Sequence, residues 1–306
     1  MIGFDHIGTM GRLGNQMFQY AALKGIAAHR GYEYTIPPEN PKIQIDNYGL
    51  IEAFELSDNK KIGWLNTQYD IIAEKHFHFD EDLFNTFPDG SGLYGFFQSE
   101  KYFKHIENEI REDFTFKDDI YEPCKEFISQ YGDEIIFLHV RRSDSTGRTE
   151  YFPIADIGWF EEMLEYFPKD VPVLILTDKL DWVKSQKLFD QDRFLLSEQR
   201  EYSKNLVWNG RGKMEYTLSP WIDLCLMSLC NGGIVPNTTF GWWGAWLQKS
   251  KNKKIVYQHP YFGPIFTRQN EAYIHVRDMH PEDWIRGHLK EEHIDTVYTP
   301  SDNEVG

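Results

Sequence analysis

The 306-residue chain has few cysteines and a deficit of basic residues. Its three cysteines, Cys124, Cys225 and Cys230, are too few and too irregularly spaced for a disulfide framework or a four-cysteine zinc site. We therefore expect reduced cysteines in the core. The 32 Lys and Arg residues against 48 Asp and Glu residues give a net charge of -16. Because such a chain is repelled by a phosphate backbone, its charge argues against nucleic-acid binding.

Long hydrophobic runs are also missing. The longest, residues 135–138 and 171–176, fall far short of the ~20 residues that span a bilayer. Residues 1–16 lack the basic start and apolar stretch of a signal peptide. With 41% hydrophobic and 16% aromatic residues, the chain can still bury a sizeable core. These features predict a soluble, cytoplasmic, globular protein without a transmembrane segment, and its length favours two domains.

Short apolar strands alternate with helical segments along the chain. A strand is predicted at residues 2–7, followed by a glycine-rich turn and a helix at residues 15–30. The clearest alternation places strands at residues 135–140, 171–176, 233–236 and 254–257, with helices at residues 157–166, 180–188, 222–230 and 240–248. This order is typical of a parallel α/β sheet. We predict two Rossmann-like domains facing a cleft, residues 1–131 and 132–306, with ligands at the carboxyl ends of the strands.

Basic residues follow the predicted strand at residues 135–140. His139 lies near its carboxyl end, Arg141 and Arg142 come directly after, and Asp144 is the one acid nearby. A guanidinium group matches phosphate oxygens in a bidentate geometry, so the cluster fits a diphosphate leaving group. The alternative is an ion pair of Arg142 with Asp144 and a solvated Arg141. His139 could act as a general base, but a hydrogen bond to ribose or backbone is favoured.

A glycine-rich turn precedes the first predicted helix. In the sequence GTMGRLGNQMFQY at residues 8–20, Gly11 and Gly14 would let the backbone approach a ligand close to free helix amides. Arg12 between them favours an anionic ligand. The spacing matches neither the dinucleotide-binding motif nor the Walker motif. The alternative is a plain turn in which Asn15 caps the helix.

A second polar turn lies near residue 237. Asn237, Thr238 and Thr239 follow a predicted short strand and precede a tryptophan-rich helix. Their hydroxyl groups and the free helix amides would face the cleft. Residues 237–239 also match a glycosylation sequon, but no signal peptide supports that interpretation.

Other patterns favour structural roles. Trp242 and Trp246 are four residues apart and share one helix face, which favours core packing over sugar stacking. Asp80 and Asp82 form a DxD sequence, which we interpret as a solvated face of an acidic chain, so we predict no metal site. The GxSxG nucleophile elbow of serine hydrolases does not occur.

Together, and in this order, the three motifs resemble the α-1,2-fucosyltransferases of glycosyltransferase family 11. GRLGNQMFQYA at residues 11–21 resembles the N-terminal motif, HVRRSD at residues 139–144 the arginine motif, and NTTFGWWGAWL at residues 237–247 the C-terminal motif. ILTD at residues 175–178 and DMHPEDW at residues 278–284 extend the similarity. The resemblance implies a GT-B architecture in which the second lobe holds GDP-L-fucose and the first contributes the acceptor side. It also implies inverting, metal-independent transfer to the 2-hydroxyl of a galactose-terminated glycan.

The resemblance also implies residue roles. Arg141 would hold the leaving diphosphate, and Arg12 and Asn15 would face the fucosyl phosphate across the cleft. The implied donor-binding set consists of Gly11, Gly14, His139, Arg142, Asp144, Asp223, Asn237, Thr238, Thr239 and Phe240. Within it, Asp144 would orient the arginines. Apart from the donor, no cofactor is implied, and the general base is not identified.

Departures from the family pattern concern the acceptor more than the donor. Family members commonly read HVRRGDY and NSSFSWW, where this chain has Ser143, Ser145, two threonines and Gly241. Animal members carry an anchoring segment, so we expect a bacterial or viral cytoplasmic enzyme that contacts lipid-linked glycans at most peripherally. Transfer to another linkage, another GDP-sugar donor and a catalytically silent binding module remain the alternatives.

Overall fold

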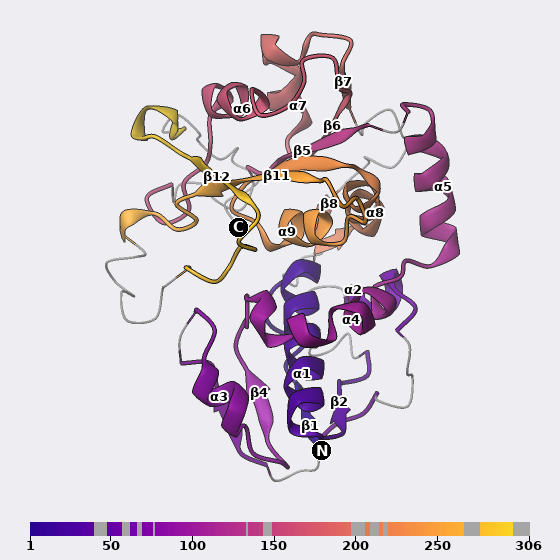
Figure 1. Ribbon diagram of the computed structural model, residues 1–306, viewed down its shortest axis with the longest axis vertical. Coiled ribbons are helices and arrows are strands. Elements are labelled where there is room, and N and C mark those ends of the chain that lie inside the picture. The colour runs from indigo at the N-terminus through magenta and orange to yellow at the C-terminus, as the bar shows by residue number, and fades with distance from the viewer. Residues whose placement is uncertain are drawn as a thin grey trace. The chain divides into compact units, whose positions relative to one another are not determined.

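The computed structural model describes residues 1–39, 48–56, 62–65, 69–75, 77–132, 134–142, 149–196, 206–208, 214–216, 220–265 and 276–295. The chain forms two compact units (Figure 1). The first unit consists of Met1–Ile120, Asn205–Thr217 and Ala272–Pro281, and the second of Tyr121–Lys204, Leu218–Glu271 and Glu282–Gly306. This division falls within helix α5 (Asp118–Ser129). The domain boundary at residues 131 and 132 stays a prediction.

The first unit contains a parallel four-stranded sheet in the order β2-β1-β4-β3 (Figure 1). Its strands are β1 (Ile2–Gly3), β2 (Tyr34–Thr35), β3 (Ile71–Ala73) and β4 (Gly92–Tyr94). The central strand β1 therefore has a neighbour on each side, which places the turn after β1 at the middle of the sheet edge.

Helix α1 (Leu13–Arg30) connects β1 to β2 and packs on both strands. It ends at Gly31, whose φ of 69° lies in the left-handed region that favours glycine. Inside the helix, a Cβ atom at Gly25 would collide with the carbonyl oxygen of Tyr102. Glycine at this position thus lets the segment after β4 pack directly against α1.

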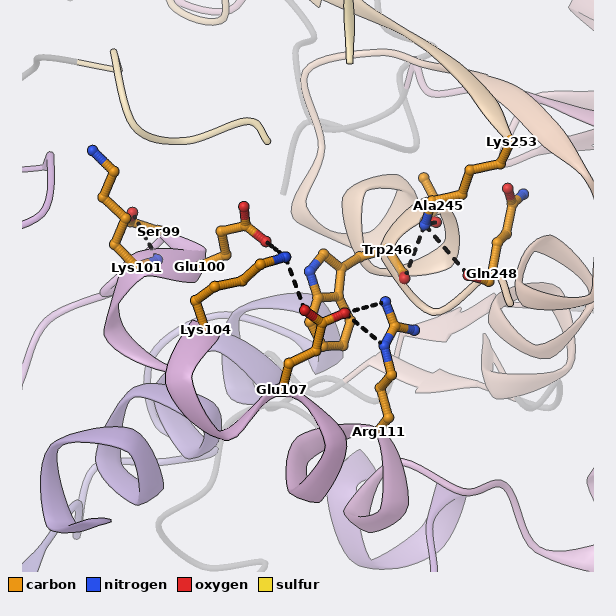
Figure 2. Close-up of polar contacts among 10 residues, drawn as sticks. All are labelled: Ser99, Glu100, Lys101, Lys104, Glu107, Arg111, Ala245, Trp246, Gln248 and Lys253. Atoms are coloured by element: carbon orange, nitrogen blue, oxygen red, sulfur yellow. Dashed lines mark hydrogen bonds and ion pairs between the residues drawn. The ribbon is translucent and has the colours of Figure 1, made fainter. Parts of the chain in front are cut away.

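The remaining helices of the first unit are short: α2 (Gly49–Ala53), α3 (Glu81–Thr86) and α4 (Glu107–Asp113). Asp80 caps α3, because its Oδ1 atom accepts a hydrogen bond from the Leu83 amide at 2.9 Å. The DxD sequence therefore begins a helix. At α4, Glu107 pairs with both Lys104 and Arg111 at 2.9 Å (Figure 2). The strands β8 (Leu206–Trp208) and β9 (Met214–Tyr216) form an antiparallel pair.

The second unit contains a parallel six-stranded sheet in the order β12-β11-β10-β5-β6-β7 (Figure 1). Its strands are β5 (Ile136–Val140), β6 (Val173–Thr177), β7 (Phe194–Leu196), β10 (Gly232–Val235), β11 (Lys254–His259) and β12 (Ile285–His288). The helices besides α5 are α6 (Ile157–Leu164), α7 (Leu180–Lys184), α8 (Pro220–Leu229) and α9 (Thr239–Trp246). The predicted alternation of strands and helices is confirmed here.

Buried side chains fill both faces of the second sheet. All five residues of β5 are buried, as expected for a central parallel strand. Trp242 and Trp246 are buried with stacked rings 6.1 Å apart, which confirms their core role. The three cysteines are buried and free, which confirms the prediction of reduced core residues. Within the described residues, no helix has the length and hydrophobicity that crossing a membrane requires.

Candidate functional site

Arg141 is held at the carboxyl end of β5 by an acid from the neighbouring strand. Because Val140 pairs with Thr177 in the sheet, the residues that follow β5 and β6 lie side by side. Asp178 places its Oδ2 atom 2.8 Å from Nη1 of Arg141, and its Oδ1 atom accepts a hydrogen bond from the Arg142 amide at 2.9 Å. One carboxylate thus fixes both the Arg141 guanidinium and the following peptide. The Arg141 side chain remains 21% exposed, so it can still reach a ligand.

Arg142 points into the protein instead. Its side chain is 1% exposed, forms an ion pair with Asp295 and donates a hydrogen bond from Nη1 to the Ala155 carbonyl at 3.2 Å. The guanidinium carbon also lies 4.0 Å from the centre of the Trp182 ring. These contacts tie the end of β5 to three other segments of the second unit, at Ala155, Trp182 and Asp295. They give Arg142 a structural role, and its predicted contact with the donor stays a prediction.

His139 is a neutral buried histidine. It is 6% exposed, and within the described part of the chain its Nδ1 atom has no hydrogen-bond partner. Burial and the nearby charge of Arg141 lower its pKa to about 4. The ring is therefore uncharged at neutral pH, and it can donate or accept a hydrogen bond beside the guanidinium without repelling it.

The amino end of α9 lies beside His139. Thr238 caps this helix, because its Oγ1 atom accepts a hydrogen bond from the Phe240 amide at 3.2 Å. The Phe240 ring centre is 5.9 Å from that of His139. The first turn of α9 contains no acid, so its partial positive charge is not neutralised there. At the other end, Lys253 donates to the carbonyls of Ala245 and Trp246 at 2.8 and 3.1 Å, which anchors the helix (Figure 2).

Gly241 allows His139 and α9 to lie this close. A Cβ atom at this position would lie 2.7 Å from the His139 Nδ1 atom and 3.0 Å from a methyl group of Val235. Any larger residue would push the ring or the helix aside. The glycine that departs from the family pattern therefore fits the local packing of this chain.

These groups meet at the point where the second sheet changes direction. From β5 the chain proceeds outward to β6 and β7, whereas from β10 it proceeds to β11 and β12 on the other side. Because β5 and β10 are adjacent, their carboxyl ends flank a topological switch point, where open α/β sheets bind ligands. The structure thus brings His139, Arg141 and the Thr238 turn together at one edge of the sheet.

The other predicted residues of this unit are placed differently. Asn237 donates from Nδ2 to the carbonyls of Pro153 and Tyr261, each at 3.1 Å, so its amide holds loops together. Thr239 begins α9 and is partly exposed. Asp223 is partly exposed in the first turn of α8. Asp144 lies outside the described residues.

In the first unit, the glycine-rich turn follows β1. Gly8 and Gly11 have φ values of 85° and 76°, which a residue with a side chain rarely adopts. Arg12 precedes α1 in an extended conformation without a side-chain cap, and Asn15 in the first turn accepts a hydrogen bond from Gln98 at 2.8 Å. This bond makes Gln98, which follows β4, a residue that orients Asn15. Gly14 is buried in the helix.

Residues 2–276 match the family described as Glycosyl transferase family 11. The chain belongs to this family. The match confirms the family predicted from the three motifs, and membership makes the protein a glycosyltransferase by class.

Two relatives illustrate the similarity in sequence. Galactoside alpha-(1,2)-fucosyltransferase 2 of Oryctolagus cuniculus is 26% identical over 262 residues, which cover 80% of this chain and 67% of that protein. Galactoside alpha-(1,2)-fucosyltransferase 1 of Homo sapiens is 25% identical over 256 residues, or 78% of this chain and 63% of that protein. This family 11 chain therefore spans about two thirds of the length of these relatives.

Solved structures share the fold. NodZ alpha-1,6-fucosyltransferase co-crystallised with GDP has a TM-score of 0.50 at 14% identity, covering 79% of this chain and 91% of that chain. POFUT1 in complex with GDP has a TM-score of 0.50 at 13% identity, covering 84% and 97%. The fold class is accordingly the predicted one, an α/β architecture of the GT-B type.

Two acids at the site were not identified from the sequence as partners of the arginines. Asp178 was noted only within the ILTD similarity, although an acid directly after a strand next to β5 is a usable signal. Asp295 had no signal, because it lies far along the chain from Arg142. Among the described residues, no group of three or more His, Cys, Asp and Glu side chains is arranged to hold a metal ion.

Proposed function

We propose that this family 11 protein transfers L-fucose from GDP-β-L-fucose to the 2-hydroxyl of a terminal β-galactoside, with inversion and without a metal ion. The observation that carries the proposal is the Arg141 guanidinium, held by Asp178 at the switch point beside the amino end of α9. This arrangement supplies a fixed positive charge and free helix amides for a diphosphate. The GDP bound to two proteins of similar fold supports the same type of ligand.

The chemistry is a direct displacement at the anomeric carbon. The acceptor oxygen forms a bond to this carbon while the bond to the β-phosphate oxygen breaks, through a transition state with oxocarbenium character. Negative charge grows on the departing phosphate, and Arg141 stabilises it together with the amides of α9. Such preorganised donors contribute roughly 10²- to 10³-fold each to the rate. Attack from the face opposite GDP converts the β-linked donor into an α-linked product.

His139 suits a hydrogen bond to the nucleoside half of the donor. Because its pKa is lowered to about 4, the ring adds no charge and leaves charge neutralisation to Arg141. Thr238 and Phe240 lie next to it and would line the same pocket. In the first unit we assign Arg12 and Asn15 to the fucosyl phosphate, through the guanidinium and the amide of the two side chains.

The linkage and the acceptor are argued from the relatives. Both relatives described above are named galactoside alpha-(1,2)-fucosyltransferases. NodZ, which shares the fold, is named an alpha-1,6-fucosyltransferase, so the fold itself does not choose the linkage. Membership of family 11 therefore favours the 2-hydroxyl of galactose over other positions.

The test is acceptor-dependent release of GDP in the presence of EDTA. Lactose or N-acetyllactosamine serves as the acceptor, and GDP-mannose replaces GDP-fucose as the control donor. We expect release from GDP-fucose only, increased by the acceptor, with an α-1,2-linked product by NMR. Binding of GDP without release from either donor would contradict the proposal and favour a binding module. A product of another linkage would correct the regiochemistry alone.

A further inference from the structure

The strands β3 and β4 of the first sheet carry exposed side chains. Gly3 of β1 pairs with Gly92 of β4, and Ala73 of β3 pairs with Tyr94. Side chains two residues apart on a strand share a face, so Tyr94 projects on the side where a Gly92 side chain would lie. A Cβ atom at Gly92 would lie 2.5 Å from the ring of Tyr69, which covers the sheet there.

The exposed side chains on these strands are aromatic or apolar. Tyr94 is 40% exposed, and Ile71 on the neighbouring strand is 53% exposed. The ring of His6, in the turn after β1, lies edge to face with Tyr94 at a centroid distance of 5.0 Å and an angle of 89°. Thr9 fixes this turn, because its hydroxyl donates to the His6 carbonyl at 2.7 Å. Tyr94 therefore has a fixed neighbour on one side and solvent on another.

Asp5, the residue before His6, supplies a carboxylate next to Tyr69. Asp5 accepts a hydrogen bond from the Tyr69 hydroxyl at 2.7 Å on Oδ2 and one from the Leu65 amide at 3.3 Å on Oδ1. Burial and the bond to Asp5 raise the pKa of Tyr69 to about 12, so its hydroxyl stays protonated and keeps donating. An ionised carboxylate has about four acceptor sites, and two bonds leave capacity for ligand hydroxyl groups.

This combination suits a neutral sugar and disfavours the donor nucleotide. The apolar face of a pyranose ring packs on an exposed aromatic ring, while its hydroxyl groups donate to a carboxylate. A diphosphate would be repelled by Asp5. At the Arg141 site the Asp178 carboxylate is neutralised by a guanidinium, whereas Asp5 accepts from a neutral amide and a neutral hydroxyl.

We propose that Tyr94, His6 and Asp5 form the subsite that binds the acceptor galactoside. The ring of Tyr94 carries the sugar, His6 holds that ring in place, and Asp5 accepts hydrogen bonds from its hydroxyl groups. This inference rests on the proposed function, since it assigns the acceptor of that reaction to the first unit. The inference concerns only the binding of the acceptor. It does not depend on which carboxylate or water molecule takes the proton from the attacking hydroxyl group.

The experiment compares Tyr94→Ala, Tyr94→Phe and Tyr166→Ala with the wild-type protein. Tyr166 is 41% exposed in the second unit and serves as the matched control. For Tyr94→Ala we expect the KM for lactose to rise roughly tenfold, whereas the KM for GDP-fucose and the acceptor-independent GDP release stay unchanged. Tyr94→Phe keeps the ring and should keep the acceptor KM within about twofold. Thermal unfolding of all variants checks that they are folded.

Two results would overturn the inference, and they differ from failure of the proposed function. If Tyr94→Ala retains the wild-type acceptor KM, or loses donor and acceptor binding equally, the subsite is misplaced. Saturation-transfer NMR with methyl β-galactoside reads binding without turnover, and Tyr94→Ala should lose the signal that the wild type and Tyr166→Ala give. The wild-type protein could give this Tyr94-dependent signal and yet turn over no acceptor. That result would refute the proposed transfer but support the sugar site.

Discussion

In each unit of this family 11 protein, a central strand is followed by a turn and a helix: β1 by α1 in the first unit and β10 by α9 in the second. The residues at these two strand-to-helix junctions differ. In an acidic chain of net charge -16, the first turns of α1 and α9 both lack acids. The amino end of α9 is capped by Thr238, whereas Arg12 begins α1 without a side-chain cap. Both junctions can attract an anion, and the second lies beside Arg141, which is ion-paired with Asp178.

The surroundings extend this difference. In the second unit, Arg141 is held by Asp178 and stays partly exposed for a diphosphate, whereas Arg142 is buried in its ion pair with Asp295. In the first unit, Arg12 precedes α1, the buried Gln98 donates to the Asn15 side chain, and the ring of Tyr94 is 40% exposed. Under the proposals above, the second unit binds the GDP diphosphate, whereas the first unit binds the neutral acceptor sugar and supplies Arg12 and Asn15 to the fucosyl phosphate. Four substitutions in the second unit test this division of roles.

The largest expected effect is on stability. Arg142→Ala removes a buried cation and leaves Asp295 without this partner, so the free energy of unfolding should fall by about 3–5 kcal/mol. Chemical denaturation monitors the loss. The control is Lys290→Ala, whose partner Glu162 is exposed and whose loss should have little effect. A loss for Arg142→Ala as small as that of the control would show that the second unit does not depend on its buried charge.

Arg141→Ala should mainly lower the rate. Because Arg141 is assigned to the leaving diphosphate, we expect kcat to fall roughly 10²- to 10³-fold with unchanged folding. Arg193→Lys provides the control, since Arg193 precedes β7 at the opposite edge of the sheet. If Arg141→Ala keeps most of the wild-type kcat, the assignment of the diphosphate to the second unit is wrong.

Asp178→Asn separates positioning from binding. The amide can still accept the bond from the Arg142 backbone, but the ion pair that orients Arg141 is lost. A hydrogen bond to a charged group contributes about 1.5–3 kcal/mol, so kcat/KM for the donor should fall roughly tenfold to a hundredfold. Thermal unfolding, with Asp181→Asn at an exposed acid of α7 as the control, separates a loss of stability from a loss of donor use. Wild-type kcat/KM would mean that Arg141 is oriented without Asp178.

His139→Gln tests a consequence for pH dependence. The folded pKa of about 4 lies below the value of about 6.5 for a free histidine. Between these values the unfolded chain binds a proton that the folded chain does not, so stability falls as the pH drops from 6.5 to 4. In His139→Gln this pH dependence of the free energy of unfolding, about 1.4 kcal/mol per pH unit, is absent. We therefore expect the free energy of unfolding to fall more for the wild type than for His139→Gln when the pH is lowered from 7.5 to 5. An equal fall in both proteins would contradict a buried neutral ring.

The central strands could be predicted from the sequence because they are buried on both faces. β5, β6, β10 and β11 appear as short apolar runs between helices and lie within about two residues of their predicted bounds. The edge strand β12 was missed because its sequence IRGH alternates polar residues with a glycine. β3 has only three residues, too few to show a period.

The site could be predicted in part. His139 and Arg141 were identified because their place after a buried strand depends on local sequence alone. Their neighbours depend on sheet order, which the sequence does not show, so Asp178 was not recognised as the partner of Arg141. The same reason applies to Gln98 and Asn15, which meet because β4 pairs with β1. The remaining roles of the predicted site residues stay predictions until ligands are measured.

The most direct test of the division between the two units is hydrogen–deuterium exchange of the wild-type protein with each ligand in turn. With GDP alone, exchange should slow in peptides that cover residues 136–142 and 235–241, while residues 92–95 keep their rate. Adding a β-galactoside should then slow exchange at residues 92–95. Protection of residues 92–95 by GDP, with none at residues 136–142, would contradict the assignment of the nucleotide to the second unit.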